Sequence, residues 1–381
     1  MLAFIACLLA TQVPIDQPSR LRTILPNGAA IVVENVPGAK SLSVQLFVSS
    51  RGTEETPITN GLRHLLEHII ARGPKGDLDQ RLETAGGFLT AETSRDAMIF
   101  RLNLPPGQLG LGIKCVEELM HMPVVTPEMI QHEALILEQE AALKDDESKF
   151  SAAAWTQAYG DKGLDPLGNL DVIRNATPPM LDGIHRIQFV ASNLVLAVAG
   201  DVDIDVATRA CYTILSKAAK ADVTGRERGT GSGGQTSVDV PGLAYSLPVP
   251  GLRMTLTAAR LAAALALASE ADGCYVIYTP SGNSGLITLG RAEDKAGLAR
   301  VIRSAEPTEL FERGQYLAKS WMARMLDTPE HIANIRGLLL VNGVDLKPDV
   351  LLENLKSMTY KQFEAAINAF KSNDVVVVSG R

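Results

Sequence analysis

Residues 61–70 read GLRHLLEHII, and this stretch decides what the rest of the chain is expected to do. His64 and His68 are four residues apart, so on a helix they project from one face, one turn apart. Two imidazoles at that spacing can share one Zn²⁺ ion. Glu67 follows His64 by three residues and lies beside the same face. Its carboxylate can therefore reach a water on the metal without being a ligand, an order that inverts the H-E-x-x-H zinc motif.

A catalytic zinc site also needs a third protein ligand and one open position. The predicted helix 127–145 offers Glu128, Glu133, Glu138, Glu140 and Asp145. Glu133 and Glu140 are seven residues apart, two turns along one partly apolar face. The metal could hold one of these acids, and a hydrogen bond to a ligand histidine could hold the other. The spacing alone leaves open which acid has which role.

The alternative interpretation of the H-x-x-E-H stretch is a solvated helix that carries two surface histidines. With only six histidines in the chain, the pattern arises by chance in roughly one chain in a hundred. The acidic pair downstream further favours a metal site. The two tryptophans, Trp155 and Trp321, we interpret as packing residues rather than substrate contacts.

Composition limits the remaining classes. The chain has 381 residues, of which 46% are hydrophobic and 21% charged, enough for two or three domains with a large core. A net charge of −7 without a long basic run argues against a nucleic-acid partner. The four cysteines, at positions 7, 115, 211 and 274, show no C-x-x-C spacing, which argues against a cysteine-ligated metal and a disulfide framework.

The N-terminus begins with an apolar run, LAFIACLLA at residues 2–10, which is too short to span a bilayer. It resembles the apolar core of a secretory signal, with small residues near a possible cut after Ala10. The usual positive start is missing, because the first basic residue is Arg20. We expect residues 1–17 to be a leader and the protein to be periplasmic or secreted; the alternative is a cytoplasmic protein.

The chain divides at a polar, glycine-rich stretch, which we expect to be a linker over residues 221–237. Both sides run from strands through helices to a buried strand, NLVLAVAG at 193–200 and DVVVVSG at 374–380. We therefore predict an α+β fold of two related domains, each a mainly antiparallel sheet packed with helices. The zinc-bearing domain would cover residues 18–220, and a second, shortened one residues 238–381.

With these motifs in place, the sequence resembles the insulinase–pitrilysin family of zinc metallopeptidases (M16), which includes mitochondrial processing peptidases and small bacterial members. The likeness covers nearly the whole chain after the leader. It is carried by four stretches: TILPNGAAIVVEN (23–35), GLRHLLEHII (61–70), LETAGGFLTAETSRDAMIF (82–100) and HEALILEQE (132–140).

The resemblance implies hydrolysis of peptide bonds. Zn²⁺ would be held by His64, His68 and Glu140, with Glu133 as the supporting acid. Glu67 would be the general base that takes a proton from water and passes it to the leaving amine. An extended peptide would pair with the edge strand around 88–95, at Thr90 and Ala91. Family members usually carry Asn-Ala there, and threonine has a shorter reach and one donor.

The resemblance also implies a partner. In the family, substrate lies in a chamber between two such two-domain units, and this chain contains one. The segment of the later half that usually supplies a substrate-binding arginine and tyrosine is absent between the predicted helix 254–270 and GCYVIYTP. We therefore expect the zinc-bearing subunit of a heterodimer, with a homologous subunit supplying both residues. The alternatives are a non-catalytic structural or assembly subunit, and a maturation factor that trims one dedicated peptide.

Overall fold

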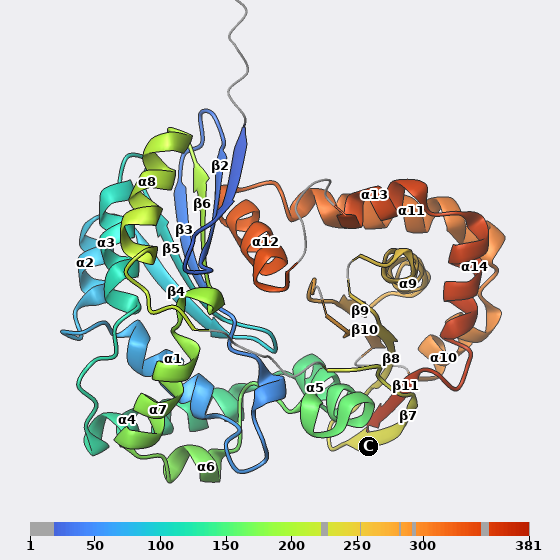
Figure 1. Cartoon of the computed structure of the whole chain (residues 1–381). Helices are drawn as coiled ribbons and strands as arrows, with labels where there is room; N and C mark the ends of the chain where they lie inside the picture. The colour runs from blue at the N-terminus through green and yellow to red at the C-terminus, as the bar shows by residue number, and fades with distance from the viewer. Residues whose placement is uncertain are drawn as a thin grey trace, which may run out of the picture.

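The computed structural model describes residues 19–221, 228–251, 253–281, 283–291, 295–343 and 350–380. The chain forms two halves, each built on one sheet with helices packed against it (Figure 1). The expected leader, residues 1–17, lies outside the described residues. Residues 222–227 of the expected linker 221–237 also lie outside them.

The first sheet has six strands in the order β1-β2-β6-β3-β5-β4. Its strands are β1 (Arg20–Ile24), β2 (Ala30–Asn35), β3 (Leu42–Val48), β4 (Phe88–Thr93), β5 (Met98–Leu104) and β6 (Leu194–Gly200). Only β2 and β6 run parallel; the other neighbours are antiparallel. β3 and β6 are buried along their whole length, so the sheet is covered on both faces at its centre.

The second sheet has the order β7-β11-β8-β10-β9. Its strands are β7 (Gly234–Val238), β8 (Leu243–Val249), β9 (Cys274–Ile277), β10 (Gly285–Arg291) and β11 (Val376–Gly380). Here β7 and β11 are the parallel pair, and the other pairs are antiparallel. The five strands repeat the order and the directions of β2-β6-β3-β5-β4. The predicted fold class of two related α+β domains is thereby confirmed.

Helices connect the strands in both halves. Those of the first half are α1 (Leu62–Ala71), α2 (Leu78–Thr84), α3 (Leu109–Leu119), α4 (Pro127–Leu143), α5 (Asp146–Tyr159), α6 (Leu170–Arg174), α7 (Pro178–Gln188) and α8 (Ile204–Leu215). Those of the second half are α9 (Thr255–Ala268), α10 (Lys295–Ser304), α11 (Pro307–Arg324), α12 (Pro329–Val341), α13 (Val350–Ser357) and α14 (Tyr360–Ala369). Short 3₁₀ turns lie at Gly52–Glu54, Gly160–Gly163 and Ala191–Asn193.

Each half lends one helix to the sheet of the other. α5 packs on the second sheet, where Phe150 and Ala154 meet Ala244 and Val376. α12 packs on the first sheet against β2, β3 and β6, and it is visible beside that sheet in Figure 1. The predicted ranges 18–220 and 238–381 stay a prediction, because each packing unit draws one helix from the other half.

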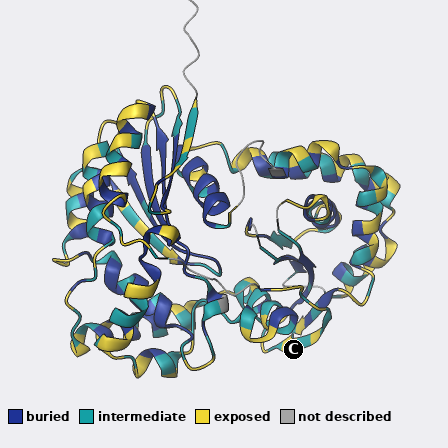
Figure 2. Ribbon diagram, in the orientation of Figure 1, coloured by how far each residue is buried: buried dark blue, intermediate teal, exposed yellow. Residues whose placement is uncertain are grey.

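α12 is buried around nearly its whole circumference, which is the pattern of a helix enclosed on all sides (Figure 2). Polar contacts also tie it to the first sheet. Arg336 Nε lies 2.9 Å from Glu34 Oε2, and Gln45 Nε2 donates to the Glu330 carbonyl at 2.9 Å. At Gly337 the helix lies directly on the ring of Phe47, since a Cβ there would sit 2.0 Å from a ring carbon.

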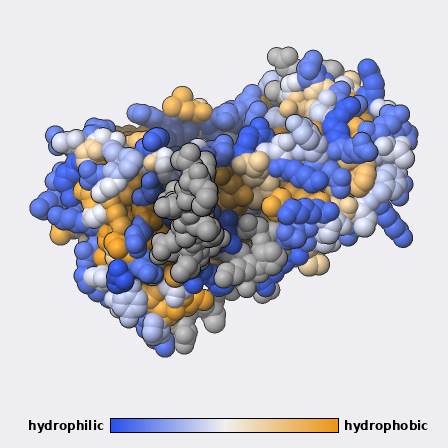
Figure 3. All heavy atoms as spheres, turned by 90° about the horizontal axis from the view of Figure 1, so that it is seen from above, coloured by the Kyte–Doolittle hydropathy of each residue, from blue (hydrophilic) through white to orange (hydrophobic). Residues whose placement is uncertain are grey.

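The surface is mixed in character. Seen from above, hydrophilic residues cover most of the visible face, and hydrophobic residues form separate patches (Figure 3). Among the described residues, no helix combines the length and the apolar character needed to cross a bilayer.

Gly337→Ala is expected to destabilise the protein by about 1–3 kcal/mol, because the added methyl group overlaps the buried Phe47 ring. The matched control is Gly183→Ala in α7, where the new methyl group meets no atom within 4 Å. That change should be neutral or should stabilise by up to about 1 kcal/mol through helix propensity. Urea unfolding of both variants checks this. Equal stability of the two variants would mean that α12 does not rest on Phe47 as described.

Candidate functional site

The start of α1 is fixed by a buried ion pair that no sequence pattern indicated. Glu55 accepts hydrogen bonds from the Gly61 N–H at 3.0 Å and from Asn60 Nδ2 at 3.3 Å. Arg63 Nε lies 3.2 Å from the same carboxylate, and the two side chains are 1% and 6% exposed. Arg63 also donates to the carbonyls of Ser50 and Ser94. These contacts satisfy groups at the helix start and compensate two charges whose burial is otherwise costly.

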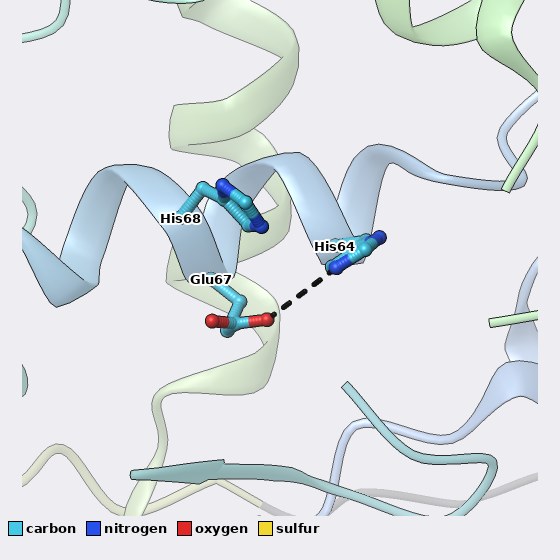
Figure 4. Close-up of side chains that lie close together, drawn as sticks. All are labelled: His64, Glu67 and His68. Atoms are coloured by element: carbon cyan, nitrogen blue, oxygen red, sulfur yellow. Dashed lines mark ion pairs between the residues drawn. The ribbon is translucent and has the colours of Figure 1, made fainter. Parts of the chain in front are cut away.

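The side chains of His64, Glu67 and His68 gather along one side of α1 (Figure 4). One ligand atom from each can be chosen so that all three lie within 4.8 Å of one another. Glu140, from α4, closes the group: its two carboxylate oxygens lie 3.5 Å from His64 Nε2 and 3.6 Å from His68 Nε2. The structure therefore brings together the four residues that the sequence grouped.

The second nitrogen of each histidine is held by another part of the chain. His64 Nδ1 lies 3.2 Å from the Leu167 carbonyl, which accepts its proton. His68 Nδ1 lies 3.2 Å from Glu133 Oε2. Glu133 is buried on α4 and also accepts a hydrogen bond from Arg72 Nε. Both imidazoles are thus fixed in orientation, with Nε2 directed to the shared space beside Glu140.

The loop that holds His64 docks closely on the start of α1. Gly61 and Gly168 both have positive φ values, and a Cβ on Gly168 would lie 2.2 Å from the Gly61 Cα. The Asn169 N–H donates to the Asn60 carbonyl at 3.0 Å. Only glycine permits this approach of two backbones. No pattern in the sequence pointed to this loop, because its contribution to the site is a main-chain carbonyl.

The side chains of the site differ in the direction of their pKa shifts. Burial, followed by the charge of His68, lowers the pKa of His64 to about 4, so its imidazole is neutral. Burial lowers the pKa of His68 too, but the hydrogen bond to Glu133 and the nearby carboxylates outweigh it and raise that pKa. Burial raises the pKa of Glu67 to about 7, although the charge of His68 opposes this. The Thr93 hydroxyl donates to Glu67 Oε2 at 3.3 Å.

The donor set fits zinc. With Zn–N distances of about 2.0–2.1 Å, the ligand atoms of a tetrahedral site lie about 3.3 Å apart. The separations of 3.5 and 3.6 Å between Glu140 and the two Nε2 atoms are close to this value. Glu67 Oε2 lies 3.8 Å from His64 Nε2, slightly farther from the shared space. Glu140 is 44% exposed, so the site opens to solvent on its side.

The site lies in a cavity of about 510 Å³ between the two halves. One wall is β4, the free edge of the first sheet, which brings Ala91 into the cavity; Thr90 is exposed and does not line it. The exchanged helices α5 and α12 form further walls. The second half contributes Ile277, Thr279, Ser281, Leu286 and Thr288.

Trp155, interpreted from the sequence as a packing residue, lies on the cavity wall. Its ring centre lies 4.4 Å from the guanidinium carbon of Arg95 and 4.8 Å from that of Arg228. Arg228 Nη2 donates to Asp96 Oδ1 at 2.7 Å, and Ser281 Oγ donates to Asp96 Oδ2 at 2.6 Å. This cluster joins parts of the chain far apart in sequence, so local patterns could not have revealed it.

Comparison with known proteins agrees with this geometry. Residues 30–164 match the model of the family described as insulinase, peptidase family M16. An uncharacterised zinc protease of Streptomyces coelicolor is 27% identical over 190 residues, 48% of this chain and 41% of that protein. The mitochondrial-processing peptidase subunit beta of Blastocladiella emersonii is 27% identical over 200 residues, 50% of this chain and 42% of that protein. The chain thus spans about two fifths of the length of these relatives.

Among solved structures, a protease from Helicobacter pylori superimposes with a TM-score of 0.82 at 15% identity, over 96% of this chain and 99% of that one. At that identity the likeness concerns the fold, which it supports over both halves. The matched segment 30–164 includes α1, β4 and α4, the elements that carry the site. Residues 30–164 are therefore similar to the insulinase family of peptidases, family M16, and the solved structure extends the likeness in fold to both halves.

Proposed function

We propose that this chain is a zinc-dependent endopeptidase, or the zinc-bearing subunit of a heterodimeric one. The observation that carries the proposal is the convergence of two imidazole Nε2 atoms on the Glu140 carboxylate, at 3.5 and 3.6 Å. Each imidazole is oriented by a separate acceptor, Leu167 O for His64 and Glu133 for His68. A solvated surface helix would not need this second layer of support.

In this proposal His64, His68 and Glu140 hold the metal, and Glu133 orients His68 and makes its imidazole more basic. A bound zinc ion supplies Lewis acidity to the scissile carbonyl and makes a water molecule easier to deprotonate. Glu67 accepts that proton and delivers it to the departing amine. Its buried position, which raises its pKa to about 7, suits a group that must both take and return a proton near neutral pH. Thr93 fixes one oxygen of this carboxylate.

The substrate in this proposal is an extended peptide that adds a strand to the free edge of β4. Ala91, Glu92 and Thr93 of β4 line the cavity, whereas Thr90 is exposed outside it. A peptide paired along β4 would pass the face of α1 that carries Glu67, because Thr93 at the end of β4 contacts that residue.

A non-catalytic structural or assembly role is the alternative from another class. The full donor set and the buried Glu67 favour the enzyme, because a structural subunit has no use for a base beside a metal site. A maturation factor that trims one dedicated peptide shares the same chemistry. Measured turnover of unrelated peptides would distinguish a general peptidase from it. Periplasmic or secreted location remains part of the proposal and depends on residues 2–10.

The proposal includes a homologous partner subunit that supplies an arginine and a tyrosine to the substrate. Among the described residues of the second half that line the cavity, none is an arginine or a tyrosine. The hydroxyls of Thr279, Ser281 and Thr288 are the polar groups there, and Ser281 is committed to Asp96. A partner chain would fill this gap.

Glu67→Gln should retain zinc and lose peptide cleavage by about 10²–10⁴-fold, because the amide cannot accept the proton. Zinc content by atomic absorption and cleavage of a quenched fluorescent peptide measure the two effects. Glu83→Gln, at an exposed position of α2, should change neither, and a chelator should abolish the wild-type activity. Cleavage by Glu67→Gln at the wild-type rate would show that Glu67 is not the general base.

Glu133→Gln should weaken zinc binding by about 10–100-fold, because His68 loses its charged acceptor and Arg72 loses its counter-ion. Glu138→Gln on the same helix is the matched control, since Glu138 pairs with Arg174 at the surface. Competition with a fluorescent zinc chelator gives both dissociation constants. Equal affinities would show that Glu133 does not support the metal site.

Addition of a homologous partner chain that carries this arginine and tyrosine should raise peptide cleavage by about 10²–10³-fold, the usual effect of one oxyanion contact. Light scattering checks whether the two chains form a heterodimer. An arginine or tyrosine variant of the partner should remove the gain and leave the heterodimer intact. Full activity of the isolated chain would contradict the need for a partner.

A further inference from the structure

The acids on the cavity wall all have a counter-charge or a role at the metal centre. Glu92 pairs with Arg101 at 2.5 Å, and Asp96 pairs with Arg228 at 2.7 Å. Asp165 pairs with Lys144. The two remaining acids, Glu67 and Glu140, belong to the metal centre. No acidic group of the cavity is therefore left to balance a further cation.

Arg95 is that further cation. It lies in the turn between β4 and β5 and lines the cavity. Within the described part of the chain, it forms no ion pair within 4.0 Å, although Lys144 and Arg228 beside it each have one. Burial, followed by the opposing effects of Asp165 and Arg228, lowers its pKa to about 9. A guanidinium in this position is a charge without direct compensation.

The side chain is nevertheless held in place. Arg95 Nη1 donates to the carbonyls of Gly163 and Leu164, at 2.9 and 2.5 Å. Its guanidinium carbon lies 4.4 Å from the centre of the Trp155 ring, which is a cation–π distance. These contacts employ the two N–H groups of Nη1. No described residue accepts a hydrogen bond from the three N–H groups on Nε and Nη2, and that edge of a guanidinium matches the two oxygens of a carboxylate.

We propose that Arg95, supported by Trp155, is a carboxylate subsite in the wall of the cavity and selects substrates that present an acidic group there. The carboxylate would come from an Asp or Glu side chain of the peptide or from its C-terminus. The cavity of about 510 Å³ is in the usual range for a ligand pocket, about 300–1,000 Å³. The inference rests on the proposed peptidase function for its biological meaning, but the subsite itself can be detected by binding alone.

The test uses Glu67→Gln with Trp321→Phe, which cannot cleave under the proposal and leaves Trp155 as the single tryptophan of the two in the chain. Four versions of one peptide are titrated for each position tested: Glu or Gln at that position, each with a free or an amidated C-terminus. Trp155 fluorescence reports binding. We expect one carboxylate to improve the dissociation constant by about 10–100-fold, as for hydrogen bonds to charged groups. The arm that shows the gain tells a side chain from a C-terminus.

Arg95→Gln in this background should abolish that preference and leave binding of the neutral, amidated peptide within about threefold. Arg95→Lys, which keeps the charge and loses the forked edge, should retain part of it. The matched control is Arg101→Gln, on the adjacent strand and already paired with Glu92; it should keep the full preference. Thermal unfolding of each variant checks the fold, and if Arg95→Gln does not fold, the wild-type and Arg95→Lys titrations decide.

Titration with and without a zinc chelator separates the subsite from the metal. A carboxylate bound by Arg95 keeps its advantage without zinc, and one bound by the metal loses it. Equal affinity for acidic and neutral peptides, or an unchanged preference in Arg95→Gln, would overturn the proposal. Failure of the proposed function would give a different result. The protein that keeps Glu67 would then cleave no peptide, although the preference for a carboxylate would persist.

Discussion

The exchange of one helix between the two halves is the constraint on which the rest of the structure depends. A sheet that is buried on both faces needs other elements packed on each of them. Here one face of each sheet is covered by a helix of the other half: α5 packs on the second sheet and α12 on the first. The same two helices line the cavity, α5 through Trp155 and α12 through Leu338. The covering of the sheets and the walls of the cavity are therefore one feature, and neither half could build the cavity alone.

Within that frame, the candidate metal centre takes its precision from groups outside α1. The helix places His64 and His68 on one side, but their orientation depends on Leu167 O and Glu133. Glu67 likewise depends on Thr93 of β4. Supporting contacts of this kind hold a ligand within a fraction of an ångström and stabilise the neutral or charged form that each role requires. The loop before α6 thus contributes to the site as much as α1, the helix that carries the two histidines.

The sequence predicted those parts of the structure that depend on local spacing. His64, Glu67 and His68 follow from the helical period. The spacing of Glu133 and Glu140 on a second helix marks both as candidates, and only the family resemblance assigns Glu140 as the ligand. The repeated closing strands β6 and β11 follow from their apolar pattern. The helix exchange was not predictable in this way, because α5 and α12 carry no local mark of which sheet they cover. The Leu167 carbonyl and the Arg95–Trp155 contact were missed for a similar reason. Every residue has a main-chain carbonyl, so no residue type marks Leu167, and two side chains sixty residues apart produce no periodic pattern in the sequence.

The buried Asp96 links the position of the two halves to the chemistry of the cavity. Its carboxylate accepts hydrogen bonds from Arg228, which lies within the predicted linker 221–237, and from Ser281, between β9 and β10. Arg228 also donates to the Ser284 carbonyl in that turn. A buried carboxylate is stable only while these donors surround it, so the turn between β4 and β5 is held at a fixed distance from its counterpart in the second half. Arg95 immediately precedes Asp96, and β4 enters the same turn. Any change in the separation of the halves would consequently move the free edge of β4 and the guanidinium of Arg95 together, so that one ion pair would couple the proposed alignment of a peptide on β4 to its proposed selection by Arg95.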